Sequence, residues 1–320
     1  MTTTAEAKPR PSLRSPKVRI ADASFRIVTL SCGLLVLAVL ALIAVFTTNQ
    51  AWPAFTRMGI EFITSRTWDP SRNQFGGLAF IYGTVIISVI ALVFAVPVSL
   101  GLALFLTEVA PRRLRKPVVY LIDILATIPS VVFGLWGIIE LQAPLGRFYR
   151  HLSSLFSGVP LLNRVFKGQE GRSFFTASLI VALMIMPIIT SLTREVFATV
   201  PAAQKEAALA LGATRWEMMR TSILGYGRSG VVGAVMLGLG RAMGETIAVA
   251  LVIGSVPSIT ANLFHSGDAM AAVIANQFPD ATGTFRAALI GLGVVLFVIT
   301  IVINMIARSF VARTERTAGA

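Results

Sequence analysis

The sequence predicts an all-α integral membrane protein with six transmembrane helices, and three observations support this fold class. Of the 320 residues, 55% are hydrophobic and only 13% are charged, whereas an ordinary soluble domain is roughly 25% charged. Six apolar stretches are long enough to cross about 30 Å of hydrocarbon. Lys and Arg gather in alternate segments between these stretches. Each stretch should form a helix, because an open strand edge leaves backbone groups unpaired in lipid.

The six spans divide the chain into four parts. We expect a basic tail at residues 1–26, the first transmembrane helix with its outer loop at 27–78, a core of five transmembrane helices at 79–308, and a short tail at 309–320. The first span is too long and too far from the start of the chain for a signal-peptide core, which indicates a retained anchor. The predicted spans lie near residues 27–47, 79–106, 117–139, 174–193, 230–256 and 287–307.

Three prolines fall in the interior of the predicted spans. Pro97, Pro129 and Pro187 each lack the backbone N–H that a helix interior needs, so each should bend its helix. Such prolines are common in membrane helices, and a role in gating stays open.

The distribution of charge orients the chain in the membrane. Basic residues are abundant before the first span, between the second and third, between the fourth and fifth, and after the sixth. Since Lys and Arg are retained on the cytoplasmic side, both termini should be cytoplasmic. One outer loop, residues 140–172, departs from this rule, but long loops follow it poorly. Its basic residues are Arg147, Arg150, Arg164, Lys167 and Arg172.

The composition argues against several other classes of protein. The net charge is +13, but the Lys and Arg residues lie mostly between apolar runs, so nucleic-acid binding is not expected and the lipid bilayer is the expected environment. The only cysteine, Cys32, cannot form an intrachain disulfide, and His151 and His265 lie in separate loops, so no metal site is expected. No G-x-x-x-x-G-K-[ST] motif is present, so the chain has no phosphate-binding loop of the ATPase kind, and we expect it to be non-catalytic and to hold no cofactor.

The region between the fourth and fifth spans, residues 194–228, is too long for a turn and too regular for a linker. Residues 201–211 are rich in Ala, Glu, Lys and Leu, which favour a helix, and Gly212 should end it. Thr214 then caps a second short helix, and Glu217 completes a capping box. Because an alanine-rich helix cannot anchor in lipid, it should pack on a protein partner at the cytoplasmic face; a plain amphipathic surface helix is the alternative.

The fifth span carries two charges. Arg241 and Glu245 stand four residues apart, so a continuous helix would place them on one face, where they can pair. Left unpaired at the bilayer centre they would cost about 5 to 7 kcal/mol, so this face should meet protein or water. Two ridges of small residues suit close packing of helices. They are Gly230, Ala234 and Gly238, and Gly240, Gly244 and Ala248.

Several motifs resemble those of a known family. Glu206, Ala207 and Ala208, followed by Gly212, are similar to the E-A-A-x-x-x-G loop of bacterial ABC importer permeases, which docks into the ATP-binding subunit. Three further segments resemble the phosphate-specific importer permeases of the PstC type. They are VPVSLGLALFLTE at 96–108, IPSVVFGLWG at 128–137 and MLGLGRAMGETIAV at 236–249.

The resemblance implies a type I ABC importer permease with a cytoplasmic coupling helix, and we call residues 194–228 the coupling segment. It implies a permease subunit of an ATP-driven inorganic phosphate importer in the bacterial cytoplasmic membrane. The implied partners are a second permease subunit, two ATP-binding cassette ATPase subunits and an extracytoplasmic phosphate-binding protein. In that setting Arg241 and Glu245 would lie on the substrate path, meeting phosphate or forming a gate.

Alternatives remain for the substrate, the class and the charged pair. Sulfate or molybdate could replace phosphate. An ion-coupled secondary transporter would usually show an internal repeat and more spans, and a scaffold without a transport path leaves the intramembrane charges without a purpose. The structural alternative for Arg241 and Glu245 is a buried ion pair that only fixes the helix register.

Overall fold

The computed structural model describes residues 16–155, 158 and 171–318, and the chain divides into two units, residues 1–49 and 50–320. Helix α1, Pro16–Met58, begins in the first unit and ends in the second. The predicted first span is therefore the middle of a longer helix, and the part of the predicted tail after residue 15 is helical. Residues 1–15 of that tail lie outside the described residues.

Four further long helices of the second unit are apolar enough to cross a membrane. Helix α3, Leu78–Leu104, continues into the π-helical turn η1, Phe105–Val109. Helix α8 covers Phe174–Ala198. Helix α11 covers Leu224–Gly244, and α14 runs over Gly283–Ala318, into the region predicted as a tail. Together with α1 they confirm five of the six predicted spans within the described residues.

The third predicted span, residues 117–139, is broken. Helix α4, Arg112–Thr127, is separated from α5, Ser130–Trp136. The helical segments on the two sides of this break, Arg112–Thr127 and Ser130–Leu155, are bent by 92°. Pro129 lacks an N–H, and the residue before a proline prefers extended backbone, as Ile128 shows with ψ of 128°. Past the bend, α5 continues through η2, Gly137–Leu141, into α6, Gln142–Leu155. The count of six spans therefore holds if this bent pair is one span.

The other two intramembrane prolines leave their helices uninterrupted. Helix α3 continues through Pro97, and α8 continues through Pro187. Of these three prolines, only Pro129 therefore lies at a break in a helix, and an extended residue precedes it.

The fifth predicted span, residues 230–256, also ends early. Helix α11 stops at Gly244, Glu245 is extended with ψ of 124°, and a separate short helix, α12, covers Ile247–Val252. Gly244 is a poor helix former, and Thr246 is β-branched, so the helix is weak at this point. Gly254 and Ser255 then have positive φ and lead into a loop.

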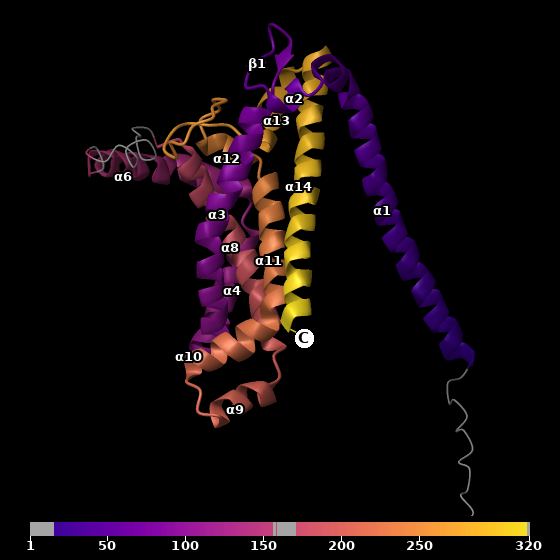
Figure 1. The fold of residues 1–320 in the computed structure, drawn as a ribbon, viewed down its shortest axis with the longest axis vertical. Helices are drawn as coiled ribbons and strands as arrows, with labels where there is room; N and C mark the ends of the chain where they lie inside the picture. The colour runs from indigo at the N-terminus through magenta and orange to yellow at the C-terminus, as the bar shows by residue number, and fades with distance from the viewer. Residues whose placement is uncertain (1–15, 156–157, 159–170, 319–320) are drawn as a thin grey trace, which may run out of the picture. The chain divides into compact units, whose positions relative to one another are not determined.

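Small elements complete the fold at the two ends of the second unit (Figure 1). At one end lie the short helix α2, Glu61–Thr64, and a hairpin of β1, Trp68–Asp69, and β2, Gln74–Phe75, with Trp68 paired to Phe75. The same end holds α13, Met270–Gln277, and the 3-10 turn η4, Phe278–Asp280. The opposite end holds α9, Ala202–Ala210, α10, Arg215–Met218, and the π-helical turn η3, Met219–Ile223.

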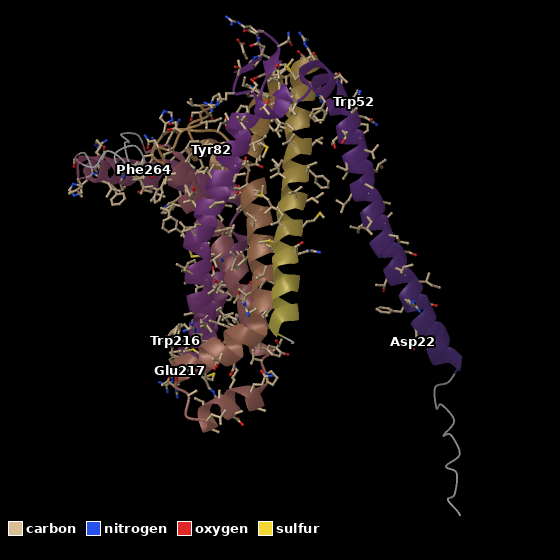
Figure 2. The ribbon with its side chains drawn as sticks, in the orientation of Figure 1. Asp22, Trp52, Tyr82, Trp216, Glu217 and Phe264 are labelled. Carbon is tan, nitrogen blue, oxygen red and sulfur yellow. The ribbon has the colours of Figure 1, made fainter. Side chains whose placement is uncertain are left out.

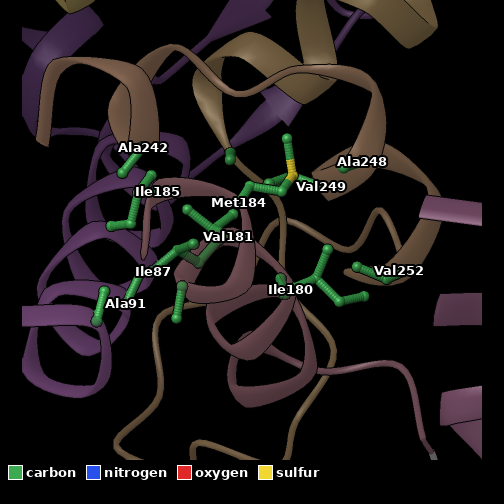
Figure 3. Close-up of a cluster of buried hydrophobic side chains, with 14 of the residues drawn as sticks. Ile87, Ala91, Ile180, Val181, Met184, Ile185, Ala242, Ala248, Val249 and Val252 are labelled. Carbon is green, nitrogen blue, oxygen red and sulfur yellow. The ribbon is translucent and has the colours of Figure 1, made fainter. Parts of the chain in front are cut away.

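The main core lies between α3, α8, α11 and α12 (Figure 3). Ile87, Ile185 and Val249 are among its buried side chains. One of the two predicted ridges of small residues packs here, since a Cβ on Gly238 would lie 2.7 Å from Ile189 Cδ1. Gly240, from the other ridge, has no such neighbour within 4 Å among the described residues. The ridge through Gly238 therefore sets the close approach of α11 to α8.

Candidate functional site

Arg241 lies in the last turn of α11 and is exposed. It shares a stripe of the helix with Gly233 and Leu237, which are exposed and spaced by four residues. Gly244 continues this surface and, in the described part of the second unit, has nothing within 4 Å of an added Cβ. The stripe is therefore uncovered within residues 50–320 as described, and it carries a guanidinium beside Gly233 and Leu237.

Glu245 is held differently from Arg241. Its side chain is buried, with 9% exposed, and its Oε1 accepts a hydrogen bond from the Ala248 backbone N–H at 3.4 Å. The carboxylate thus lies at the start of α12, where unpaired backbone N–H groups favour negative charge. Both residues are described by the structure, and no ion pair joins them. The prediction that they pair on one face of a continuous helix is wrong, because α11 ends between them.

The break before α12 lies against α5, the helix that follows the bend in the third predicted span. Helix α5 packs on α12, and a Cβ on Gly134 would lie 3.0 Å from the Ala248 Cα and 2.7 Å from Leu251 Cδ1. Gly137, one turn on, packs against Ile180 of α8. Two glycines therefore bring α5 and η2 close to the helix that follows Arg241 and Glu245.

The coupling segment folds as the sequence predicts. Gly212 has φ of +87° and follows α9, with its N–H bonded to Leu209 O at 3.0 Å and the Ala213 N–H bonded to Ala208 O at 3.1 Å. This is the paired hydrogen bonding of a Schellman C-cap. Thr214 and Glu217 form the predicted capping box at the start of α10. Both halves of the hairpin are thus fixed by local hydrogen bonds.

The exposed surface of the coupling segment carries large apolar side chains. Leu211 is 90% exposed and Trp216 is 60% exposed. Figure 2 labels Trp216 at the end of the molecule that holds α9 and α10. Glu206 and Ala207 are also exposed, whereas Ala208 faces inward and packs on a buried cluster that includes Phe197. Exposed leucine and tryptophan at the tip of a protruding hairpin are typical of a surface that another protein covers.

An ion pair joins the coupling segment to the end of α3, and sequence analysis missed it. Lys205 Nζ donates to Glu108 Oε1 at 2.5 Å, and only 22% and 16% of the two side chains are exposed. Glu108 lies in η1, at the end of the span that α3 forms. The partners are 97 residues apart. No spacing rule connects them, so a local signal could not have identified the pair.

A second carboxylate is buried at the end of the bundle opposite the coupling segment. Asp268, in the loop between α12 and α13, is 2% exposed, and its Oδ1 accepts from the Ala269 N–H at 2.8 Å. Burial raises the pKa of Asp268 to about 7, more than its single hydrogen bond lowers it. The loop between α12 and α13 contains no Lys or Arg, so no basic residue of this loop pairs with the carboxylate.

The arrangement defines a class of protein: a multi-pass helical permease with the architecture of ABC importers. Solved structures share this fold. The chain superposes on a bacterial alginate ABC transporter in complex with alginate pentasaccharide-bound periplasmic protein with a TM-score of 0.59, over 92% of this chain and 98% of that one, at 18% identity. A second structure, of a bacterial ABC transporter involved in import of the acidic polysaccharide alginate, gives a TM-score of 0.55 over 92% of this chain and 99% of that one, also at 18% identity.

Comparison with sequences narrows the class to a family. Residues 95–316 match the family of binding-protein-dependent transport system inner membrane components, and the chain belongs to that family. It is 43% identical over 304 residues to the phosphate transport system permease protein PstC of Mesorhizobium japonicum, covering 94% of this chain and 93% of that protein. It is 44% identical to the PstC of Xylella fastidiosa, covering 83% of each chain. The similarity to the PstC type that the sequence motifs predicted is thereby confirmed.

Proposed function

We propose that this protein is the permease subunit of an ATP-driven inorganic phosphate importer. The observation that carries the proposal is Arg241, a guanidinium on the uncovered stripe of an apolar helix. A guanidinium binds tetrahedral oxyanions through paired N–H groups. The choice of phosphate rests on the whole-length similarity to proteins named phosphate permeases.

The translocation path is formed between this chain and a second permease subunit. The stripe through Gly233, Leu237 and Arg241 is where we place that subunit, because an exposed apolar stripe needs cover and a charge in a membrane needs water or a partner. Arg241 meets the anion or gates its passage. Glu245 stabilises the break before α12, because its carboxylate accepts a hydrogen bond from the Ala248 N–H. It does not pair with Arg241.

Energy comes from two ATP-binding cassette subunits, so the chain is non-catalytic and holds no cofactor. The exposed residues of the coupling segment, including Glu206, Ala207 and the turn at Gly212, dock on an ATPase, while Ala208 and Lys205 transmit its movement inward. An extracytoplasmic phosphate-binding protein delivers the anion at the opposite end of the bundle.

We place the end that carries α9 and α10 in the bacterial cytoplasm, together with both chain termini. Four basic residues cluster in the first turns of α4, beside the end of α3, and this is the side on which membrane proteins retain positive charge. They are Arg112, Arg113, Arg115 and Lys116. The protein is then a multi-pass component of the cytoplasmic membrane.

Copurification and uptake test this function. The chain should leave the membrane with a second permease and an ATPase, and phosphate should stimulate hydrolysis by the reconstituted complex more than sulfate or molybdate does. Arg241→Gln should abolish uptake of labelled phosphate without preventing assembly, whereas Arg308→Gln, an exposed position on α14, should leave uptake intact. Normal uptake by the Arg241 variant would refute the role of Arg241, and stimulation by sulfate alone would refute phosphate.

A further inference from the structure

Three buried hydroxyl groups lie on α3 and α8, two helices that pack closely against each other. Ser99 of α3 is fully buried, and its hydroxyl donates a hydrogen bond to the backbone carbonyl oxygen of Met186 in α8 at 3.1 Å. Thr190 and Thr193 of α8 are buried as well, and their hydroxyl groups have no hydrogen-bond partner among the described residues. Unpaired buried hydroxyl groups are rare in folded proteins, so they need a physical explanation.

Other buried hydroxyl groups on these two helices are paired within their own helix. Thr84 of α3 and Ser178 of α8 each donate to the carbonyl oxygen four residues earlier, at 2.8 and 2.7 Å. This is the common hydrogen bond of a serine or threonine inside a helix. For Thr190 the corresponding acceptor is the Met186 oxygen, to which Ser99 already donates.

The Met186 oxygen cannot accept from both hydroxyl groups while the helix is intact. A carbonyl oxygen has two lone pairs, and in an α-helix one of them accepts from the N–H four residues later, here that of Thr190. The Ser99 hydroxyl takes the other. The Thr190 hydroxyl is therefore unpaired because Ser99 occupies its acceptor. No such competitor explains the unpaired hydroxyl of Thr193.

Each of the two helices carries a proline beside this contact. Pro97 lies two residues before Ser99, and Pro187 directly follows Met186. A proline removes one backbone hydrogen bond from its helix. Because fewer backbone bonds resist bending there, α3 and α8 can change their separation at this level more easily than elsewhere.

We propose that Ser99 and Thr190 exchange the Met186 carbonyl oxygen during the transport cycle, which gives α3 two positions relative to α8. In the position shown, Ser99 donates across the interface and the Thr190 hydroxyl is unpaired. In the other position α3 lies away from Met186, Thr190 donates to the Met186 oxygen, and Ser99 donates to the Ala95 oxygen of its own helix. Packing of the helices favours the first position, and one additional hydrogen bond favours the second. Such opposed contributions allow two states of similar free energy.

Both helices of this contact reach the coupling segment. Helix α3 leads into η1, where Glu108 pairs with Lys205 of α9, and α8 is followed by α9 after a short turn. A movement of α9 therefore acts on α3 and α8 together. The inference rests on the proposed function in one respect, since it assumes that an ATPase moves the coupling segment. It does not depend on which anion is carried.

Pulsed EPR on the whole complex in nanodiscs, in the presence of ATP, measures the separation of the two helices. Spin labels are attached at Gly101→Cys on α3 and Glu195→Cys on α8, both exposed positions, in a Cys32→Ala background. The unaltered contact should give two label distances. Ser99→Ala and Thr190→Val should each lower the ratio of long-distance to short-distance molecules about fivefold, the value of one net hydrogen bond. The double variant should lower it no further.

Each single variant removes the advantage of the second position. Without the Ser99 hydroxyl, Thr190 can donate to the Met186 oxygen while α3 stays in place, so the movement of α3 gains no hydrogen bond. Without the Thr190 hydroxyl, the second position gains none either. Thr190→Ser keeps the hydroxyl and should restore the ratio. The matched control is Ser178→Ala, which removes a buried hydroxyl that is paired within α8 and should leave the ratio unchanged.

Three results would overturn the proposal. If Ser99 only ties the helices together, Ser99→Ala raises the share of long distances. If a water molecule shared by Ser99 and Thr190 holds the helices, both single variants raise it. A single label distance in the complex with both hydroxyl groups intact would exclude a second position. Phosphate import by the same complexes is measured in parallel, and its absence alone would refute the proposed function and leave the response of the label distances to be judged separately.

Discussion

Replacing Glu108 by Gln should uncouple ATP hydrolysis from phosphate import. The Glu108–Lys205 pair is mostly buried, with about a fifth of each side chain exposed. Exposed ion pairs contribute roughly 0.2 to 1 kcal/mol, and breaking a fully buried pair costs roughly 3 to 5 kcal/mol. Because this pair lies between these limits, removing one partner should weaken the attachment of α9 to the end of α3 by about 1 to 3 kcal/mol. About 1.4 kcal/mol corresponds to a factor of ten in an equilibrium constant. The ratio of molecules with α9 held against the end of α3 to molecules with α9 detached would therefore fall about 5- to 150-fold.

The assay is the ratio of ATP hydrolysed to phosphate imported in proteoliposomes. Glu108→Gln and Lys205→Met should each raise this ratio, and the exchanged pair Glu108→Lys with Lys205→Glu should restore much of the coupling. Arg113→Gln, an exposed position near the start of α4, is the control for charge alone. If both single variants keep the ratio of the unaltered complex, or if the exchanged pair is worse than either, the ion pair does not transmit movement.

Three further predictions concern local geometry and pH. Gly212→Val should strain a backbone at φ of +87° by about 1 to 2 kcal/mol and raise the ATP-to-phosphate ratio, and an unchanged ratio would contradict this. Gly238→Val should lower the thermal stability of the purified chain by about 1 to 3 kcal/mol, because its Cβ would meet Ile189, whereas Gly240→Val should not; equal losses would contradict this account. The pKa of Asp268 is about 7 in the folded chain and near 3.8 in the unfolded chain, so between these two pH values only the folded chain keeps the proton. Stability should therefore fall as pH rises through this window and level off above it, by up to about 4 kcal/mol. Asp268→Asn should remove this dependence in thermal unfolding scans, and parallel pH profiles would refute it.

Elements specified by neighbouring residues could be predicted from the sequence. The five long spans follow from apolar length, and the coupling hairpin follows from Gly212 and from the Thr214 capping box, whose hydrogen bonds lie within a few residues. The motif of Glu206 and Ala207 also predicted the family correctly.

Features that depend on distant contacts could not be predicted. Pro129 indicated a bend, but the 92° angle depends on how α5 packs against α12 through Gly134. The predicted pairing of Arg241 and Glu245 is wrong because a spacing of four residues implies a shared face only while the helix is continuous, and α11 ends before Glu245. Lys205 and Glu108 meet only because α9 folds back beneath α3.

The break between α11 and α12 places Arg241 and Glu245 in different surroundings. Non-helical backbone at membrane depth is tolerated only where it is packed in protein or lines a watered space. The break at Glu245 is packed, with its carboxylate bonded to the Ala248 N–H and with Gly134 of α5 against Ala248. Arg241, one turn earlier, faces outward from the same bundle. An arginine already paired with a carboxylate would bind an oxyanion poorly. On the proposed function, the break would therefore aid anion passage by holding the Glu245 carboxylate away from the Arg241 guanidinium.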